Sequence, residues 1–121
     1  MRFGRALTGV IATIALATAA SAAGYDGTYI GTSATFTGTT SGGKGNVCSP
    51  MKAPYSLTIS GGHAQVKWGD GTLTGDVDAN GKLIMHSTAS GRFEGQIDAS
   101  GALKGNYEGY CIYALSWQRR G

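Results

Sequence analysis

Histidine, cysteine and proline are scarce in this chain, which has two of each among its 121 residues. We recognise in it no Ser/His/Asp set, no pair of catalytic carboxylates and no cluster of metal-ligating histidines. The sequence therefore predicts a protein that is not an enzyme and that needs no cofactor or metal. Helical periodicity is also missing outside the N-terminal segment, and the abundant Thr, Ser and Gly residues predict an all-β chain with tight turns.

The one long apolar run lies at the N-terminus. Arg2 and Arg5 precede an apolar stretch over residues 7–20, and Ala20-Ser21-Ala22 has the small-x-small pattern of a cleavage site. The run is short for a membrane span, and no cysteine follows the cleavage point to carry a lipid. We therefore predict a signal peptide at 1–22, a single β domain at 23–121, and a periplasmic or secreted protein without a membrane anchor.

Charge of either sign is low once the predicted leader is removed. The full chain carries a formal +3, whereas the part after residue 22 has eight Lys/Arg against seven Asp/Glu, a formal +1. Such a balance predicts no nucleic-acid partner, and we interpret Arg119 and Arg120 as a solvated tail. We expect a monomer.

Glycine, in contrast, is abundant, with 21 residues. A small polar residue followed by glycine recurs every ten residues, at Ser60-Gly61, Asp70-Gly71, Asn80-Gly81, Ser90-Gly91 and Ser100-Gly101. Apolar and polar residues alternate between these pairs, as they do in half-buried strands joined by hairpin turns. Hairpin turns join antiparallel neighbours, which favours a meander over a β-solenoid.

The pattern predicts an antiparallel up-and-down meander of about eight strands. They lie near residues 25–36, 55–60, 63–68, 72–78, 82–88, 92–98, 102–107 and 110–118. Pairing of the first strand with the last would remove both sheet edges, so we expect a small barrel or a strongly curled sheet. Tyr29 and Ile30 of the first strand cannot both face inward, and the sequence leaves that choice open. We predict an exposed, mobile loop at 37–46.

Turn chemistry predicts the register of this meander. We expect two-residue loops at 61–62 and 70–71 and three-residue loops at 79–81, 89–91 and 99–101. The opposed pairs are then Leu57–Val66, Trp68–Leu73, Val77–Leu83, Met85–Gly95 and Ile97–Leu103. A slip of one residue would reverse the buried face of a whole strand.

Five inner-face positions form one row in this register: Gly75, Met85, Gly95, Gly105 and Tyr113. Glycine inside a strand marks a bend or a close approach, so we interpret the row as a device for curvature. The alternative is a small ligand cavity beside Met85, because three side chains are missing there. A narrow eight-stranded barrel is usually filled by its own side chains, although some hold one ligand.

The two cysteines predict one disulfide, Cys48–Cys111. Two cysteines in an exported chain pair most simply with each other. They lack the ligand spacing of a zinc site and the Cys-x-x-Cys pattern of a redox motif. The bond would tie the proline-containing connector before residue 55 to the last strand.

On the outer face, the register predicts cross-strand pairs of polar residues. Lys82 lies between Asp78 and Asp98. His86 lies between Thr74 and Glu94, and His63 has no evident partner. We interpret these pairs as structural, since no nucleophile accompanies His86 and Glu94.

The chain resembles a group of small exported proteins from alphaproteobacteria. The resemblance covers most of the part after the leader. It rests on Tyr25-Asp26-Gly27, Cys48, Tyr55-x-Leu-x-Ile-x-Gly-Gly-x-Ala-x-Val66, the Gly-x-Leu/Phe-x-Gly repeats, Cys111 and Trp117-Gln118-Arg119-Arg120. It implies export and a β-rich, disulfide-linked domain, and it carries no activity or site residues.

Two functional hypotheses follow. The first is an exported binding module for a protein or an envelope glycan, because loops on rigid scaffolds commonly bind partners. The second is a carrier of a small ligand in the barrel interior near Met85.

Overall fold

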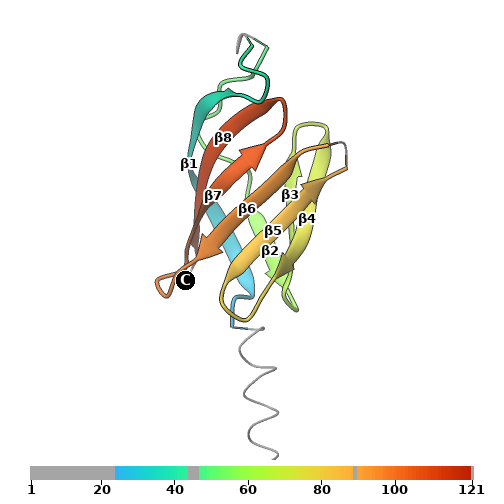
Figure 1. The fold of residues 1–121 in the computed structure, drawn as a ribbon. Helices are drawn as coiled ribbons and strands as arrows, with labels where there is room; N and C mark the ends of the chain where they lie inside the picture. The colour runs from blue at the N-terminus through green and yellow to red at the C-terminus, as the bar shows by residue number, and fades with distance from the viewer. Residues whose placement is uncertain (1–23, 44–46, 89, 121) are drawn as a thin grey trace, which may run out of the picture.

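The computed structural model describes residues 24–43, 47–88 and 90–120 (Figure 1). The predicted signal peptide at 1–22 and its cleavage point lie outside these ranges. The strands of the described part are β1 (Gly27–Thr39), β2 (Leu57–Ser60), β3 (His63–Trp68), β4 (Gly71–Val77), β5 (Lys82–Ser87), β6 (Arg92–Ile97), β7 (Ala102–Glu108) and β8 (Cys111–Arg119). Among the described residues, no helix is long and apolar enough to cross a membrane.

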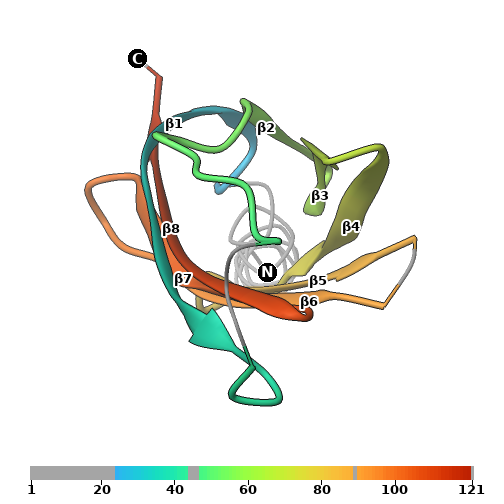
Figure 2. The same ribbon diagram turned by 90° about the horizontal axis from the view of Figure 1, so that it is seen from above.

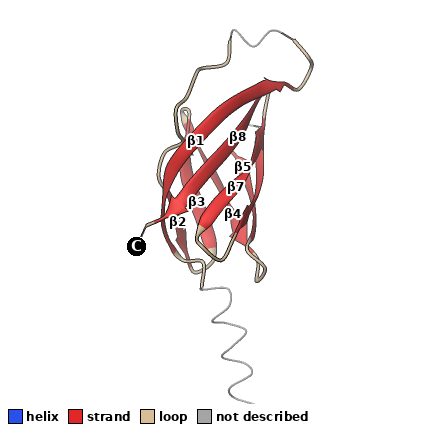
Figure 3. Ribbon diagram, turned by 90° about the vertical axis from the view of Figure 1, so that its left-hand side faces the viewer, coloured by secondary structure: helices blue, strands red, loops and turns tan. Residues whose placement is uncertain are grey.

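The strands form a closed antiparallel barrel. Each strand pairs with its neighbour in the chain, and β1 pairs with β8 to close the circle (Figure 2). Closure joins the first and last strands of the meander, which would otherwise be its two edges, although β1 pairs with β2 over Gly27–Tyr29 only. Figure 3 shows the strands strongly tilted relative to the long axis, as closure of a small barrel requires. The predicted all-β up-and-down barrel is confirmed.

The longest strand, β1, bends along the barrel wall. Its pairing with β8 shifts register between Gly31 and Ser33 and again between Phe36 and Gly38. Within β1, Tyr29 is fully buried and Ile30 is 38% exposed, so Tyr29 takes the inner position that the sequence left open. The strand continues through Thr39, so the first three residues of the predicted loop at 37–46 belong to the barrel wall. Residues 40–43 are exposed, and 44–46 lie outside the described residues.

The core is the barrel interior, filled by alternate residues of every strand. Its largest fully buried side chains include Trp117, Tyr29, Phe93, Leu57 and Met85. In the described part no polar or charged residue is buried. Phe93 and Trp117 meet edge to face, with ring centroids 5.4 Å apart, a favourable aromatic geometry.

Three predicted turns are confirmed. Leu57 lies opposite Val66 around the two-residue loop 61–62. Val77 lies opposite Leu83, and Ile97 opposite Leu103, around the three-residue loops 79–81 and 99–101.

The other two turns lie one residue earlier in the chain than predicted, which changes the pairing register of each hairpin by two residues. Gly69 and Asp70 form the loop between β3 and β4, so Trp68 lies opposite Gly71 and Leu73 opposite Val66. The Ser87 N–H donates to the Gly91 carbonyl oxygen across the turn between β5 and β6, so Met85 lies opposite Phe93 rather than Gly95. In the loop between β3 and β4, Gly69 adopts the left-handed conformation, with φ of 56°. A shift of two keeps each strand's inner face, which is why the alternation of apolar residues did not reveal it.

Candidate binding surface

The two ends of the barrel carry different loops. The glycine-turn end consists of the turns 61–62, 79–81 and 99–101. The disulfide end consists of the β3–β4, β5–β6 and β7–β8 turns and the described connector residues 40–43 and 47–56 between β1 and β2. Long connectors on rigid scaffolds are common binding elements, so the disulfide end is the first place to look for a site.

The described connector residues 47–56 reach over the opening at the disulfide end (Figure 2). Two inward-facing aromatic residues hold them there. The Tyr113 hydroxyl donates to the Ser49 carbonyl oxygen at 2.7 Å, and the Trp117 Nε1–H donates to the Tyr55 carbonyl oxygen at 2.8 Å. Burial raises the pKa of Tyr113, so its hydroxyl keeps the proton that it donates.

The connector also packs closely against β1. The Ala34 N–H donates to the Lys52 carbonyl oxygen at 3.1 Å, and Pro54 is buried. A Cβ at Gly31 would overlap the Pro54 carbonyl oxygen, so this approach requires glycine.

The predicted disulfide Cys48–Cys111 is confirmed. It joins the connector to the first residue of β8, with the two Cα atoms 5.8 Å apart and a sequence separation of 63. Together with the two aromatic hydrogen bonds, it attaches the connector to the barrel at several points.

Aromatic residues gather beneath and around the connector. The Trp68 and Tyr107 rings pack with centroids 4.4 Å apart, and Trp68 meets Tyr113 edge to face at 6.0 Å. Both Trp68 and Tyr107 are half-buried, whereas Tyr55 is 60% and Tyr110 49% exposed. We call Met51, Tyr55, Trp68, Tyr107 and Tyr110 the mouth surface.

Three hollows of about 290, 300 and 370 Å³ meet at Trp68. The largest lies along the connector and is lined by Pro50, Met51, Ala53, Pro54, Tyr55, Trp68 and Gly69. The second lies over the disulfide, between Val47 and Tyr110. The third lies between the β3–β4 and β5–β6 turns and is more polar. Together they form a hollowed surface with an aromatic centre.

No protein-family model, curated protein or solved structure matches this chain.

Sequence reasoning did not identify the mouth surface. It placed Trp68 and Tyr107 on the inner face, as the structure does, but gave them no role beyond the core. Both lie near the ends of strands, where an inner position is only half covered. The sequence does contain a feature that could have identified them. Each is an aromatic residue at an inner position, near the strand end that lies on the same side of the barrel as the long connector.

The predicted cavity row does not exist as one row. Gly75 lies opposite Met85, and Gly95 opposite Gly105, but Met85 lies opposite Phe93 and Gly105 opposite Leu115. The two-residue shift between β5 and β6 separates Met85 from Gly95. Tyr113 lies opposite Tyr107, one layer nearer to the mouth.

The space beside the three row glycines is occupied. A Cβ at Gly95 would lie 2.6 Å from the Phe93 ring and 2.8 Å from the Lys104 carbonyl oxygen. A Cβ at Gly75 or Gly105 would overlap backbone of the adjacent strand. These contacts are close approaches between strands, as the curvature interpretation expects.

The polar outer face also differs from the prediction. Asp78 lies beside Lys82 as predicted and accepts its backbone N–H, but Gln96 rather than Asp98 lies on the other side, and the Lys82 ammonium group pairs with neither aspartate. The Lys82 Nζ lies 2.9 Å from Glu94, which also meets the Arg92 guanidinium at 2.9 Å. A hydrogen bond from Lys82 and, to a lesser extent, one from Arg92 lower the pKa of Glu94. Glu94 lies within reach of Lys82 because the register between β5 and β6 differs by two residues from the predicted one.

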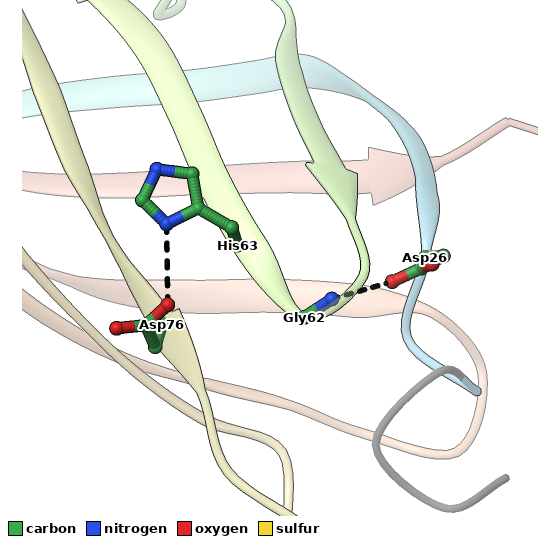
Figure 4. A network of polar contacts seen from close by, with 4 residues as sticks. All are labelled: Asp26, Gly62, His63 and Asp76. Carbon is green, nitrogen blue, oxygen red and sulfur yellow. Dashed lines mark hydrogen bonds and ion pairs between the residues drawn. The ribbon is translucent and has the colours of Figure 1, made fainter. Parts of the chain in front are cut away.

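His86 keeps its predicted neighbour Thr74 but lies opposite Arg92 rather than Glu94. His63, predicted to have no partner, has its Nδ1 3.1 Å from Asp76 (Figure 4). Its other ladder neighbour is Ser60, so three catalytic residue types share one row of the outer face.

This row lacks the surroundings of a nucleophilic site. The side chains of His63 and Asp76 are 56% and 83% exposed. The nearby Gly61 and Gly62 N–H groups, which could serve as oxyanion donors, are bonded to Asp26 at 2.7 and 2.9 Å. In the described ranges, moreover, no group of three or more His, Cys, Asp and Glu residues could hold a metal ion. The mouth surface is therefore the strongest candidate site.

Proposed function

We propose that the chain is an exported binding module that acts in the periplasm or outside the cell. Its partner is a macromolecule of the envelope or the exterior, a protein or a glycan, and its binding surface is the mouth surface. The observation that carries this proposal is the concentration of exposed aromatic residues around three hollows on a connector held by a disulfide.

Rigidity at the mouth supports binding. A partner that meets a preorganised surface loses less conformational entropy on association than one that must order a loop. Aromatic residues contribute large contact areas for few rotatable bonds, and they dominate many interfaces.

The disulfide supports the location. It fits an oxidising compartment, and cytosolic proteins rarely keep such bonds. The apolar N-terminal run and the small-x-small pattern at 20–22 add the expectation of a cleaved leader. Intact-mass analysis of periplasmic material should find a chain that starts at Ala23 and has no alkylatable thiol. A retained leader, or two thiols that react without reduction, would contradict export.

Capture from the envelope fraction tests the binding surface. The mature domain serves as bait beside a Tyr55→Ser/Tyr110→Ser variant, which removes two exposed rings of the mouth. Ile30→Ser is the matched control, because Ile30 is also exposed but lies on the barrel wall. We expect the control to retain partners that the mouth variant loses. Equal capture by all three proteins would refute the assignment of the mouth surface.

The alternative, a small-ligand carrier, needs space beside Met85. The Phe93 ring and neighbouring backbone atoms fill the positions where that space was expected. We therefore do not propose an interior ligand.

A further inference from the structure

The most polar of the three hollows at Trp68 lies between the β3–β4 turn and the β5–β6 turn. It has a volume of about 290 Å³ and is lined by Trp68, Asp70, Gly71, Thr72, Ser87, Thr88 and Tyr107. This is near the lower end of the range of small-molecule sites, roughly 300–1,000 Å³. We propose that this hollow binds a sugar residue of a neutral glycan, with Trp68 as the stacking platform. The inference rests on the proposed function and names the ligand class for one part of the mouth surface.

The aromatic part of the hollow is a platform and not a cage. Trp68 and Tyr107 pack against each other, with centroids 4.4 Å apart and planes tilted by 43°. Rings in contact cannot surround a ligand from several sides. Both rings line the hollow and offer it apolar surface, which suits the C–H groups of a sugar ring, because the face of an aromatic ring is electronegative.

The polar part of the hollow has one carboxylate and hydroxyl groups. Asp70 is exposed, and among the described residues neither its carboxylate nor the hydroxyls of Thr72 and Thr88 form a hydrogen bond or an ion pair. A carboxylate accepts hydrogen bonds from sugar hydroxyls, and threonine hydroxyls both donate and accept them. The lining thus has the mixture of one stacking face and several polar groups that a polyhydroxylated ring can satisfy.

The same lining disfavours other ligands. It has no lysine or arginine to bind a phosphate or another anion, and Asp70 would repel one. A purely apolar ligand would remove water from the Asp70 carboxylate without replacing its hydrogen bonds, which is unfavourable. A quaternary ammonium group would meet Asp70 and the Trp68 ring, but it prefers to be enclosed by several ring faces.

The hollow is preorganised by contacts between its two turns. The Thr88 N–H donates to the Thr72 carbonyl oxygen at 3.2 Å. Gly71 makes room for the Thr88 side chain, since a Cβ there would lie 2.5 Å from Thr88 Oγ1. The Tyr107 hydroxyl is held near Gly91 and Gly109, where any added Cβ would collide with it. The two further hollows on other sides of Trp68 extend the surface, so an oligosaccharide fits better than a single sugar.

Titration of the oxidised domain with defined oligosaccharides tests the proposal. The probes are neutral tetrasaccharides of glucose, galactose, mannose and N-acetylglucosamine, followed by calorimetry and tryptophan fluorescence. Trp68 is half-exposed and Trp117 buried, so a change in emission reports mainly on Trp68. We expect saturable binding of at least one neutral probe. We also expect Trp68→Ala and Asp70→Ala each to weaken it by about tenfold or more, the scale of a lost anchoring side chain.

Two further variants separate stacking from general damage. Trp68→Phe keeps a ring and should retain most of the affinity that Trp68→Ala loses. Ile30→Ser changes an exposed residue of the barrel wall, outside the mouth surface, and should leave binding of the tetrasaccharide nearly unchanged. Because Asp70 is exposed in a loop, Asp70→Ala keeps the test valid even if Trp68→Ala unfolds the domain.

Tetramethylammonium and inorganic phosphate complete the probe set. Saturable binding of either one, without binding of any neutral probe up to about 10 mM, the weak limit of useful affinities, would overturn the glycan assignment. If no probe binds but the Tyr55→Ser/Tyr110→Ser bait loses envelope partners, the glycan assignment fails and the proposed function stands. If no probe binds and the wild-type and Tyr55→Ser/Tyr110→Ser baits capture the same partners, the glycan assignment and the proposed function both fail.

Discussion

The two ends of the barrel are built by different means. At the glycine-turn end, each three-residue turn is held by an aspartate that precedes it. The Asp78 carboxylate accepts the N–H groups of Asn80 and Lys82 at 2.8 and 3.0 Å. Twenty residues later the Asp98 carboxylate accepts those of Ser100 and Ala102 at 2.9 and 3.0 Å. The same turn thus appears twice, with all of these bonds within four residues.

At this end, a glutamine side chain donates to a turn carbonyl oxygen in two places. Gln96 Nε2 donates to the Asn80 carbonyl oxygen at 2.6 Å, and Gln118 Nε2 donates to the Ser100 carbonyl oxygen at 2.9 Å. Each turn is therefore tied to the next hairpin. The backbone N–H and C=O groups of these turns are already hydrogen-bonded within the fold, so few remain to bond a partner.

The disulfide end depends on contacts between residues far apart in sequence. Tyr113 and Ser49 are 64 residues apart, Trp117 and Tyr55 are 62 apart, and the cysteines are 63 apart. These contacts hold the connector while aromatic side chains remain partly exposed. The comparison teaches that the three-residue turns of one end are held by bonds within four residues, whereas contacts across more than 60 residues hold the connector at the other end.

Removal of the disulfide should have the largest effect on the free energy of unfolding, because it frees the connector at the disulfide end. In the chain-entropy model, a loop of 63 residues stabilises the fold by about 4 kcal/mol. We expect Cys48→Ser/Cys111→Ser to lower the free energy of unfolding by roughly that amount, measured by urea denaturation. Wild type under a reductant is the control and should match the variant. A change below about 1 kcal/mol would show that the connector is held without the bond.

A side chain at Gly95 tests the wall between the two ends. Its Cβ would collide with the Phe93 ring and the Lys104 carbonyl oxygen, and overpacking of this kind costs about 1–3 kcal/mol. We expect Gly95→Ala to be destabilised in thermal and urea unfolding, with Lys104→Ala on the exposed outer face as the nearly neutral control. We also expect wild type to show no saturable binding of apolar dyes. A stable Gly95→Ala protein, together with tight dye binding by wild type, would restore the carrier hypothesis.

The turn glycines test the glycine-turn end directly. Gly81 and Gly101 have φ values of 85° and 86°, which β-branched residues resist. We expect Gly81→Val and Gly101→Val each to lower the free energy of unfolding by more than about 1 kcal/mol. Ala99→Val, in the same exposed turn as Gly101, provides the matched control. Melting of both glycine variants at the wild-type temperature would refute the role of these turns.

The smallest effect we expect is the pH dependence of the same end. Hydrogen bonds from Gly62 and Gly61 lower the pKa of Asp26, and those from Ser100 and Ala102 lower that of Asp98. A carboxyl group with a lowered pKa in the fold stabilises it above the ordinary value of 3.8, and this contribution is lost as pH falls through the lowered pKa.

Melting temperatures at pH 7 and about pH 2 measure this loss. Asp26→Asn and Asp98→Asn should each show a smaller fall than wild type between the two conditions. Asp70→Asn is the control, because no hydrogen bond or ion pair of Asp70 occurs within the described residues. An unchanged fall in the first two variants would mean that these carboxylates do not contribute to the pH dependence.

The alternation of apolar residues and the spacing of the turns were enough to predict most of the fold. They identified the strand order, the inner face of β2 to β8 and three of the turns, and they left open whether the curled sheet closes into a barrel. Local chemistry carries this information, because a short turn admits few conformations and a pleated strand has a period of two. The disulfide followed from there being only two cysteines in a chain expected to be exported.

Tertiary packing alone decided the two shifted turns and everything that depends on them. A shift of two residues preserves the buried face of every strand, so alternation cannot detect it. At the β5–β6 turn, Gly91 serves not as a left-handed turn residue but as the space in which the Tyr107 hydroxyl lies. The partners of Met85, Glu94 and His86, and the aromatic centre of the mouth at Trp68, follow from such contacts between distant residues. Only the closed barrel, with the connector held across its opening, brings them together.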